Sequence, residues 1–327
     1  MLLHGSFDDM RFSKISTIGY YDYEYANCQN IEFLNSVSGI IYSRVYQDDY
    51  GFDSKFSFNT GRNWTSLGYL PLYFRDQCIR QECILFVSDT CKFKGESRFL
   101  TDKNSPNLIL TLGFLMVGQQ YIDGFLISED FGRTWYLGKT NVRHFTLLDQ
   151  GGIIVAVENN GVLHYSFDHG ITWTTQQIQQ NIEVLEIFPF EDQELKQAII
   201  LAQTRTDRSW IIIIVDLSTI FDRNCSKNDY DVLLSPIGSH SCIRGMKTIA
   251  YKRKREILCF NKMDELLHQS DANCICTEDD LKCGYGFVMG KSDCEVDTDY
   301  KKSRKKTCKY GEYHSSKIIL FRQPLPR

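Results

Sequence analysis

The sequence lacks features that mark several common protein classes. It has only 6 Pro and 4 Trp in 327 residues, and no run of the ~18 apolar residues that a membrane-spanning helix needs. Its net charge is −4, so we expect no nucleic-acid partner. The 7 His show no ligand spacing, and no two carboxylates stand out as an acid and a nucleophile. We therefore expect no cofactor, no metal site and no catalytic residue.

The first residues also lack the pattern of a secretory leader, because residues 1–12 contain no apolar core and no cleavage site. Since the cysteines described below indicate an oxidising lumen, we expect the chain to be part of a longer protein.

What the sequence does contain favours β-strands. There are 21 Phe and 18 Tyr, and short apolar runs recur between turn residues without a helical period. These runs predict strands at 40–45, 83–87, 108–117, 124–128, 152–157, 161–167, 198–203 and 210–217.

A repeated motif, S-x-D-x-G-x-T-W, occupies residues 128–135 and 166–173, and a weaker copy occupies 57–64. The spacing of the two full copies fits a four-stranded propeller blade of roughly 40 residues. In this motif, the Asp box, the carboxylate accepts backbone hydrogen bonds of its own turn, Gly permits positive φ, and Trp caps the blade core. The predicted structural residues are Asp130, Gly132, Trp135, Asp168, Gly170, Trp173, Asn59, Gly61 and Trp64.

After residue 222 the composition becomes charged and rich in cysteine. Of 12 Cys, eight lie in this tail, and such density indicates disulfides replacing an apolar core. The disulfide candidates are Cys225, Cys242, Cys259, Cys274, Cys276, Cys283, Cys294 and Cys308 in the tail, with Cys78, Cys83 and Cys91 before it. We expect one local bridge among the last three, the remaining cysteine being free or paired with Cys28. Asn63 and Asn224 lie in sequons and are candidate glycosylation sites.

The tail carries a specific resemblance. Asp222-Arg-Asn-Cys225, Cys242-Ile-Arg-Gly245, Tyr251-Lys-Arg-Lys-Arg255 and Cys274-Ile-Cys276 follow one another behind the Asp boxes. This succession resembles the end of the luminal domain of sortilin-type vacuolar protein sorting receptors, such as the yeast carboxypeptidase Y sorting receptor. The resemblance implies a propeller followed by disulfide modules, soluble hydrolase or peptide cargo, a Golgi-to-vacuole or endosome location, and a membrane anchor outside this chain.

We therefore predict an all-β protein: a partial β-propeller of about five blades over residues 1–222, then a small disulfide-rich tail over 223–327. The predicted function is that of the luminal part of a sorting receptor, not an enzyme. A truncated, non-functional homologue is a second hypothesis, because an open propeller exposes blade faces and strand edges.

The alternative function is that of a sialidase-like Asp-box glycosidase, and two further patterns have other interpretations. Asp boxes also occur in sialidases, and Phe321-Arg322-Gln323-Pro324 resembles their arginine motif, but here it follows the boxes instead of preceding them. Cys274 and Cys276 are too close for the usual zinc pair. The basic runs 252–255 and 301–306 are interpreted as solvated loop faces.

Overall fold

The computed structural model describes residues 2–6, 11–16, 31–34, 36, 39–47, 51–58, 61, 64–69, 78, 83–88, 97–190, 196–234, 246–261, 270–273, 287–290 and 294–296. The chain divides into two compact units. The first comprises Met1–Leu2 and Ile15–Asp280, and the second comprises Leu3–Lys14 and Leu281–Arg327. The second contains most of a hairpin formed by β1 (Leu2–Ser6) and β2 (Arg11–Ser16), together with the hairpin of β23 (Phe287–Met289) and β24 (Cys294–Val296).

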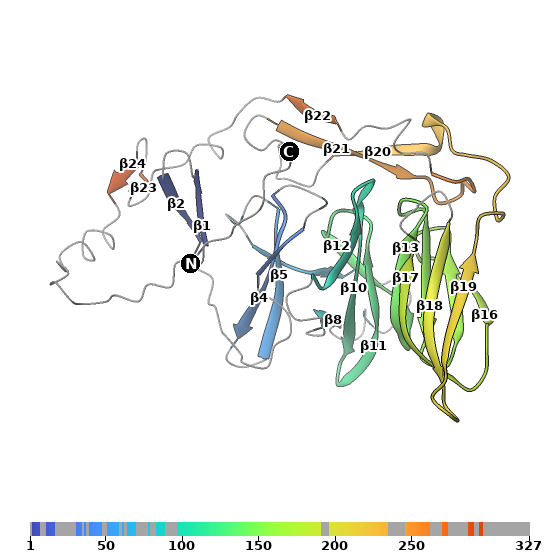
Figure 1. Cartoon of the computed structure of the whole chain (residues 1–327). Coiled ribbons are helices and arrows are strands. Elements are labelled where there is room, and N and C mark those ends of the chain that lie inside the picture. Colours follow the sequence, from blue (N-terminus) through green and yellow to red (C-terminus); the bar gives the residue numbers. More distant parts are fainter. Residues whose placement is uncertain are drawn as a thin grey trace, which may run out of the picture. The chain divides into compact units, whose positions relative to one another are not determined.

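Four sheets follow one another along the first unit, and their strands are antiparallel except for one parallel pair in the second (Figure 1). The first contains β3 (Ile31–Phe33), β4 (Ile41–Gln47), β5 (Gly51–Ser57) and β6 (Thr65–Ser66) in sequence order. The second contains six strands: β7 (Gly68–Tyr69), β8 (Cys83–Val87), β9 (Phe99–Asp102), β10 (Ser105–Val117), β11 (Gln120–Ser128) and β12 (Thr134–Thr140). Five of them lie in the order β7-β12-β11-β10-β8, and β9 also pairs with β10.

The third and fourth sheets also run in sequence order. The third contains β13 (Val142–Leu148), β14 (Ile153–Glu158), β15 (Val162–Ser166) and β16 (Thr174–Gln177). The fourth contains β17 (Ile182–Pro189), β18 (Gln197–Thr204) and β19 (Trp210–Asp216). This meander order is that of propeller blades. The prediction of an all-β, partial-propeller fold is confirmed, whereas the count of about five blades stays a prediction.

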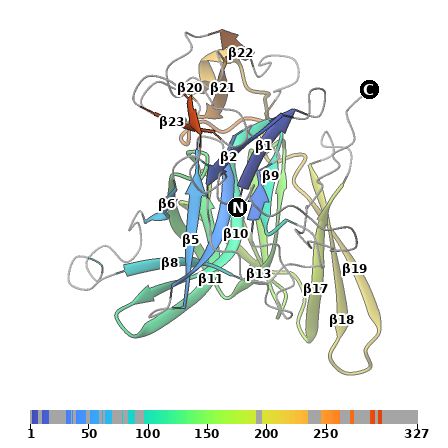
Figure 2. The ribbon, with the colours of Figure 1, turned by 90° about the vertical axis from the view of Figure 1, so that its left-hand side faces the viewer.

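The apolar core lies between neighbouring sheets. Tyr42 and Phe56 of the first sheet pack with Ile109 and Trp135 of the second, and all four are almost fully buried. Further clusters join the second sheet to the third and the third to the fourth. Both faces of the inner sheets are covered in this way, which explains why their strands are nearly continuous apolar runs instead of strict alternations. Figure 2 shows the same sheets from the side.

The fourth sheet differs from the third on one face and at one edge. Its side chains Trp210, Ile212 and Ile214 are 64%, 68% and 59% exposed, because no described sheet covers them. In the third sheet a fourth strand follows the Asp box, whereas β19 leads into no box. Among the described residues no further strand pairs with β19.

Beyond β19 the chain forms a 3₁₀ turn, η2 (Lys227–Asp229), and a three-stranded sheet. This sheet contains β20 (Tyr230–Leu234), β21 (Met246–Arg253) and β22 (Ser270–Asn273). No helix in the described part of the chain is long and apolar enough to cross a membrane.

Candidate functional site

The Asp boxes place their carboxylates inside their own turns. Asp168 accepts hydrogen bonds from the backbone N–H groups of Ile171 (3.1 Å) and Thr172 (2.9 Å) and from the Thr172 hydroxyl (2.6 Å). Although burial opposes ionisation, the hydrogen bonds from Thr172 and Ser166 hold the pKa of Asp168 below its ordinary value. Asp130 accepts the corresponding bonds from the backbone N–H (2.8 Å) and hydroxyl (2.7 Å) of Thr134. These carboxylates bond within their own turns and stabilise them.

The glycines and tryptophans of the motif repeat the same geometry. Gly132 and Gly170 have φ of 91° and 88°, a region that favours glycine. The indole N–H of Trp135 donates to the Gly132 carbonyl at 2.8 Å, and that of Trp173 donates to the Gly170 carbonyl at 2.9 Å. In the third copy, Trp64 donates to the carbonyl of Gly61 at 3.0 Å, and Asn59 lies outside the described residues.

A charged cluster joins the two full boxes to β21. Glu129, next to the first box aspartate, is 6% exposed and accepts hydrogen bonds from the Tyr136 hydroxyl (2.8 Å) and from Arg255. It also forms an ion pair with Lys252 and a hydrogen bond with His169 Nδ1 (3.2 Å), the residue that follows the aspartate of the second box. This cluster was not predicted from the sequence. Its one signal there is that variable positions of the two boxes hold an acidic residue, Glu129, and a basic residue, His169.

The cluster favours an ionised carboxylate. Burial opposes ionisation of Glu129, but its contacts with His169, Arg255 and Lys252 outweigh burial and hold its pKa well below the usual range. Burial lowers the pKa of the His169 imidazole, against the opposing effect of Glu129. Lys252 and Arg255 are therefore the cations that compensate Glu129 when His169 is neutral.

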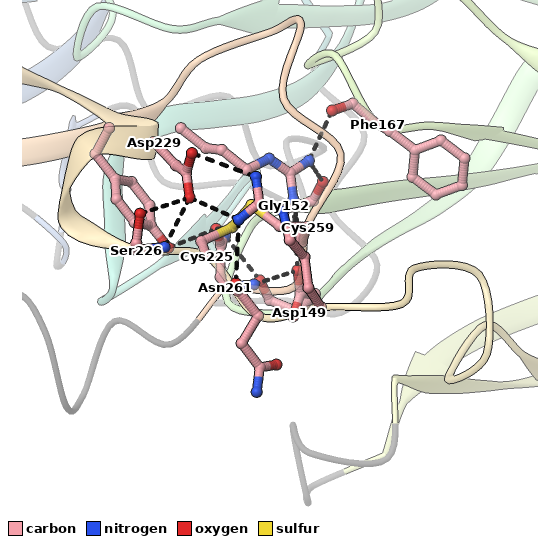
Figure 3. Close-up of a disulfide and its surroundings, with 12 residues drawn as sticks. Asp149, Gly152, Phe167, Cys225, Ser226, Asp229, Cys259 and Asn261 are labelled. Atoms are coloured by element: carbon pink, nitrogen blue, oxygen red, sulfur yellow. Dashed lines mark hydrogen bonds and ion pairs between the residues drawn. A yellow bond between two sulfur atoms is a disulfide. The ribbon is translucent and has the colours of Figure 1, made fainter.

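A second buried network lies beside the Cys225–Cys259 disulfide, whose surroundings Figure 3 shows, and its central side chain is Arg253. Its guanidinium, 2% exposed, donates to the carbonyls of Cys259 (2.6 Å), Gly152 (2.6 Å) and Phe167 (2.7 Å). The same group lies 3.6 Å from the carboxylate of Asp149. One side chain of β21 thus connects two turns of the third sheet to the disulfide region.

Asp149 is fully buried and belongs to the same network. Its Oδ2 accepts the Asn261 backbone N–H at 2.9 Å, and its Oδ1 lies 3.4 Å from Lys196 Nζ. Burial raises the pKa of Asp149 to about 6, against the lowering effects of Asn261, Lys196 and Arg253.

These contacts correct the interpretation of the basic run 252–255 as a solvated loop face. Lys252 and Arg253 lie in β21, and Lys252, Arg253 and Arg255 bind groups of the second and third sheets. Lys254, the remaining residue of the run, is half-buried and donates through Nζ to the carbonyl of Asn228 at 2.8 Å. The second basic run, 301–306, lies outside the described residues.

Two disulfides are present in the described residues, Cys78–Cys83 and Cys225–Cys259. Cys294 lies in β24. The cysteines outside the described residues are Cys28, Cys91, Cys242, Cys274, Cys276, Cys283 and Cys308. Of the two sequon asparagines, Asn224 is exposed and Asn63 lies outside the described residues, as does Arg322 of the sialidase-like motif.

A depression of about 280 Å³ lies at the end of the sheets opposite to Arg253. Charged side chains of both signs line it: Asp123, Arg143, Glu158 and Arg205. No group of three or more His, Cys, Asp or Glu in the described ranges is arranged to hold a metal ion. The depression offers hydrogen bonds and charge to a polar ligand.

Together, the Asp-box sheets and the disulfide-linked segment docked on them define a propeller-type chain with a disulfide-stabilised C-terminal extension. The chain belongs to the sortilin family. Residues 11–187 match the family model described as "Sortilin, neurotensin receptor 3", and residues 190–322 match its C-terminal counterpart. The resemblance identified from the sequence is thereby confirmed.

Curated relatives are similar over most of this chain. Sortilin of Rattus norvegicus is 24% identical over 302 residues, which cover 85% of this chain and 36% of the relative. "Vacuolar protein sorting/targeting protein 10" of Candida dubliniensis is 28% identical over 261 residues, 73% of this chain and 16% of the relative. The chain thus spans about a third or less of the length of these relatives.

Solved structures match at TM-scores too low to bear on function. A GH74 enzyme of Niastella koreensis has a TM-score of 0.32 at 10% identity, covering 66% of this chain and 36% of that one. The NanB sialidase of Streptococcus pneumoniae has a TM-score of 0.23 at 14% identity, covering 66% and 33%.

Proposed function

We propose that this chain is part of the luminal, non-enzymatic portion of a sorting receptor that binds soluble hydrolases or peptides and carries them from the Golgi to the vacuole or endosome. The observation that carries the proposal is the pair of sortilin-family matches, which together extend from residue 11 to residue 322 with one short gap. The fungal relatives are named vacuolar protein sorting/targeting proteins.

The charged depression is the surface that we assign to cargo. Arg143 lies at the start of β13 and Glu158 at the end of β14, so they present opposite charges to a peptide. Such charges influence the association rate and specificity more than the total affinity. Arg143 is exposed, and its replacement leaves the core intact.

The test is binding of the full secreted chain to a soluble vacuolar hydrolase such as carboxypeptidase Y, measured by surface plasmon resonance. We expect saturable binding that Arg143→Glu weakens at least about five-fold. Arg133→Glu, an exposed arginine at the opposite end of the second sheet, should bind like the parent. Absence of saturable binding by the folded parent would contradict the receptor assignment. Equal affinities of the two variants would show that the depression is not the cargo-binding surface.

The second candidate is a homologue that no longer binds cargo. The exposed Trp210, Ile212 and Ile214 favour it, because an uncovered blade face of this composition promotes self-association. Under this hypothesis the secreted chain forms concentration-dependent aggregates in sedimentation velocity and does not bind hydrolase at any concentration at which it is monomeric.

A further inference from the structure

The sequon Asn224-Cys225-Ser226 has an exposed acceptor and a constrained backbone. The Asn224 side chain is exposed, and no hydrogen bond to another described residue holds its amide. The middle residue, in contrast, is bonded through Sγ to Cys259 and is 4% exposed. A glycan on Asn224 therefore fits the folded surface, although the residue beside it is buried.

Hydrogen bonds fix the sequon on both sides of the asparagine. Phe260 donates its N–H to the carbonyl of Arg223 (3.0 Å) and accepts the N–H of Cys225 (2.8 Å). The Ser226 hydroxyl donates to the carboxylate of Asp229 at 2.9 Å, and the Ser226 N–H donates to the same oxygen at 2.7 Å. Residue 260 reaches this position because it follows the disulfide partner Cys259 directly.

N-glycosylation needs the features that this geometry removes. The transferase binds a sequon as a flexible segment and recognises the hydroxyl of its third residue. In the reaction, Asn224 Nδ2 forms a bond to C1 of a lipid-linked oligosaccharide and the amide loses a proton. The bond from C1 to the pyrophosphate oxygen breaks, and the lipid pyrophosphate leaves with the electron pair.

Disulfide closure competes for the same segment. The thiols of Cys225 and Cys259 lose two electrons and two protons to the oxidised disulfide of a thiol–disulfide oxidoreductase, which becomes a dithiol. Because the two cysteines are 34 positions apart, the sequon is synthesised first. At a synthesis rate of about 5–20 residues per second, the interval before Cys259 is made is about 2–7 s.

We propose that Asn224 is an N-glycosylation site that is modified only before the Cys225–Cys259 disulfide closes. Closure draws Phe260 onto the sequon backbone, beside the local turn in which Asp229 accepts the Ser226 hydroxyl. The oxidised, folded chain is then no longer a substrate, so the timing of disulfide closure sets the glycan occupancy. The inference rests on the luminal location in the proposed function, and it is independent of cargo binding.

The experiment uses the full chain folded oxidatively without glycan, purified oligosaccharyltransferase and lipid-linked oligosaccharide. Occupancy of Asn224 is measured by mass spectrometry after enzymatic deglycosylation in ¹⁸O water. We expect Cys259→Ser, which keeps the sequon, to be modified at least about ten-fold faster than the oxidised parent. Cys78→Ser, which removes the other described disulfide, should remain as slow as the parent, and Asp229→Ala should lie between.

Equal rates of modification for the oxidised parent and Cys259→Ser would overturn the proposal that glycosylation must precede disulfide closure. A synthetic peptide of residues 221–229 serves as the unfolded reference, and Ser226→Ala sets the background. If that peptide is modified but Cys259→Ser is not, Asn224 is not a site in this chain. Since the assay contains no hydrolase, its failure leaves the cargo-binding result untouched.

Discussion

Replacement of Arg253 by Ala measures how strongly the segment after residue 222 is fixed to the Asp-box sheets. The change removes three hydrogen bonds to backbone carbonyls and the ion pair with Asp149, and it leaves that carboxylate buried. Removal of one partner of a buried charged pair costs about 3–5 kcal/mol. Since folded domains are stable by only about 5–15 kcal/mol, this is a large fraction of the total.

The assay is urea unfolding monitored by tryptophan fluorescence. Trp135 is fully buried between sheets, and Trp173 packs against the apolar cluster between the second and third sheets. With a slope of about 3 kcal/mol per molar urea, a loss of about 4 kcal/mol lowers the midpoint by about 1.3 M. Arg208→Ala is the matched control, because Arg208 is a mostly exposed arginine that pairs with Glu183. Surface pairs contribute about 0–1 kcal/mol, so its midpoint should move by about 0.3 M or less.

A double-mutant cycle with Asp149→Asn isolates the interaction energy between the Arg253 guanidinium and the Asp149 carboxylate. We expect the combined variant to lose about 1–3 kcal/mol less than the sum of the two single changes, because each single change leaves the other group without its buried counter-charge. If Arg253→Ala shifts the midpoint no more than Arg208→Ala, the docking of β21 described above is wrong.

Four further predictions follow from other contacts. Cys259→Ser opens a loop of 34 residues and should cost about 4 kcal/mol of unfolding free energy, measured by urea titration of the oxidised parent and the variant. Asp168→Ala removes the acceptor of the second Asp box and should cost about 2–3 kcal/mol, with the fluorescence of Trp173 shifted; an unchanged urea midpoint would refute the turn role. The folded pKa of Asp149 is about 6 and its ordinary value is 3.8. The contribution of Asp149 to the free energy of unfolding is therefore complete below pH 3.8, and it falls by about 3 kcal/mol as the pH rises to 6. The free energy of unfolding of the parent, relative to that of Asp149→Asn, should fall by this amount over the same pH range. Ile212→Lys places a charge on the exposed face of β19 and should reduce aggregation in sedimentation velocity without lowering the urea midpoint.

The sequence predicts those strands and turns whose side chains bond within a few residues of one another. The Asp box specifies a strand, a turn and a strand within eight residues, and the structure shows β11–β12 and β15–β16 on either side of the two boxes. The predicted strand 83–87 coincides with β8. These elements depend on side chains that bond within their own turn, so neighbouring residues carry the information.

The long-range contacts could not be predicted, because their partners lie far apart in the sequence. The partners of Arg253 lie 86 and 101 positions before it, and a run of Lys and Arg in one sequence resembles a solvated surface. Asp149 carries no motif, and Glu129 occupies a variable position of its box. Only the three-dimensional arrangement shows that these residues compensate one another.

The anchoring by Arg253 also determines where the chain can be divided by recombination or engineering. The change in composition at residue 222 suggests a module boundary, but the guanidinium that saturates the Gly152 and Phe167 carbonyls comes from beyond it. A transplanted piece ending at 222 would leave these carbonyls without their donor, Glu129 without Lys252 and Arg255, and Asp149 with Lys196 as its remaining cation. The smallest portable portion of these sheets therefore extends through Asn261, whose backbone N–H binds the carboxylate of Asp149.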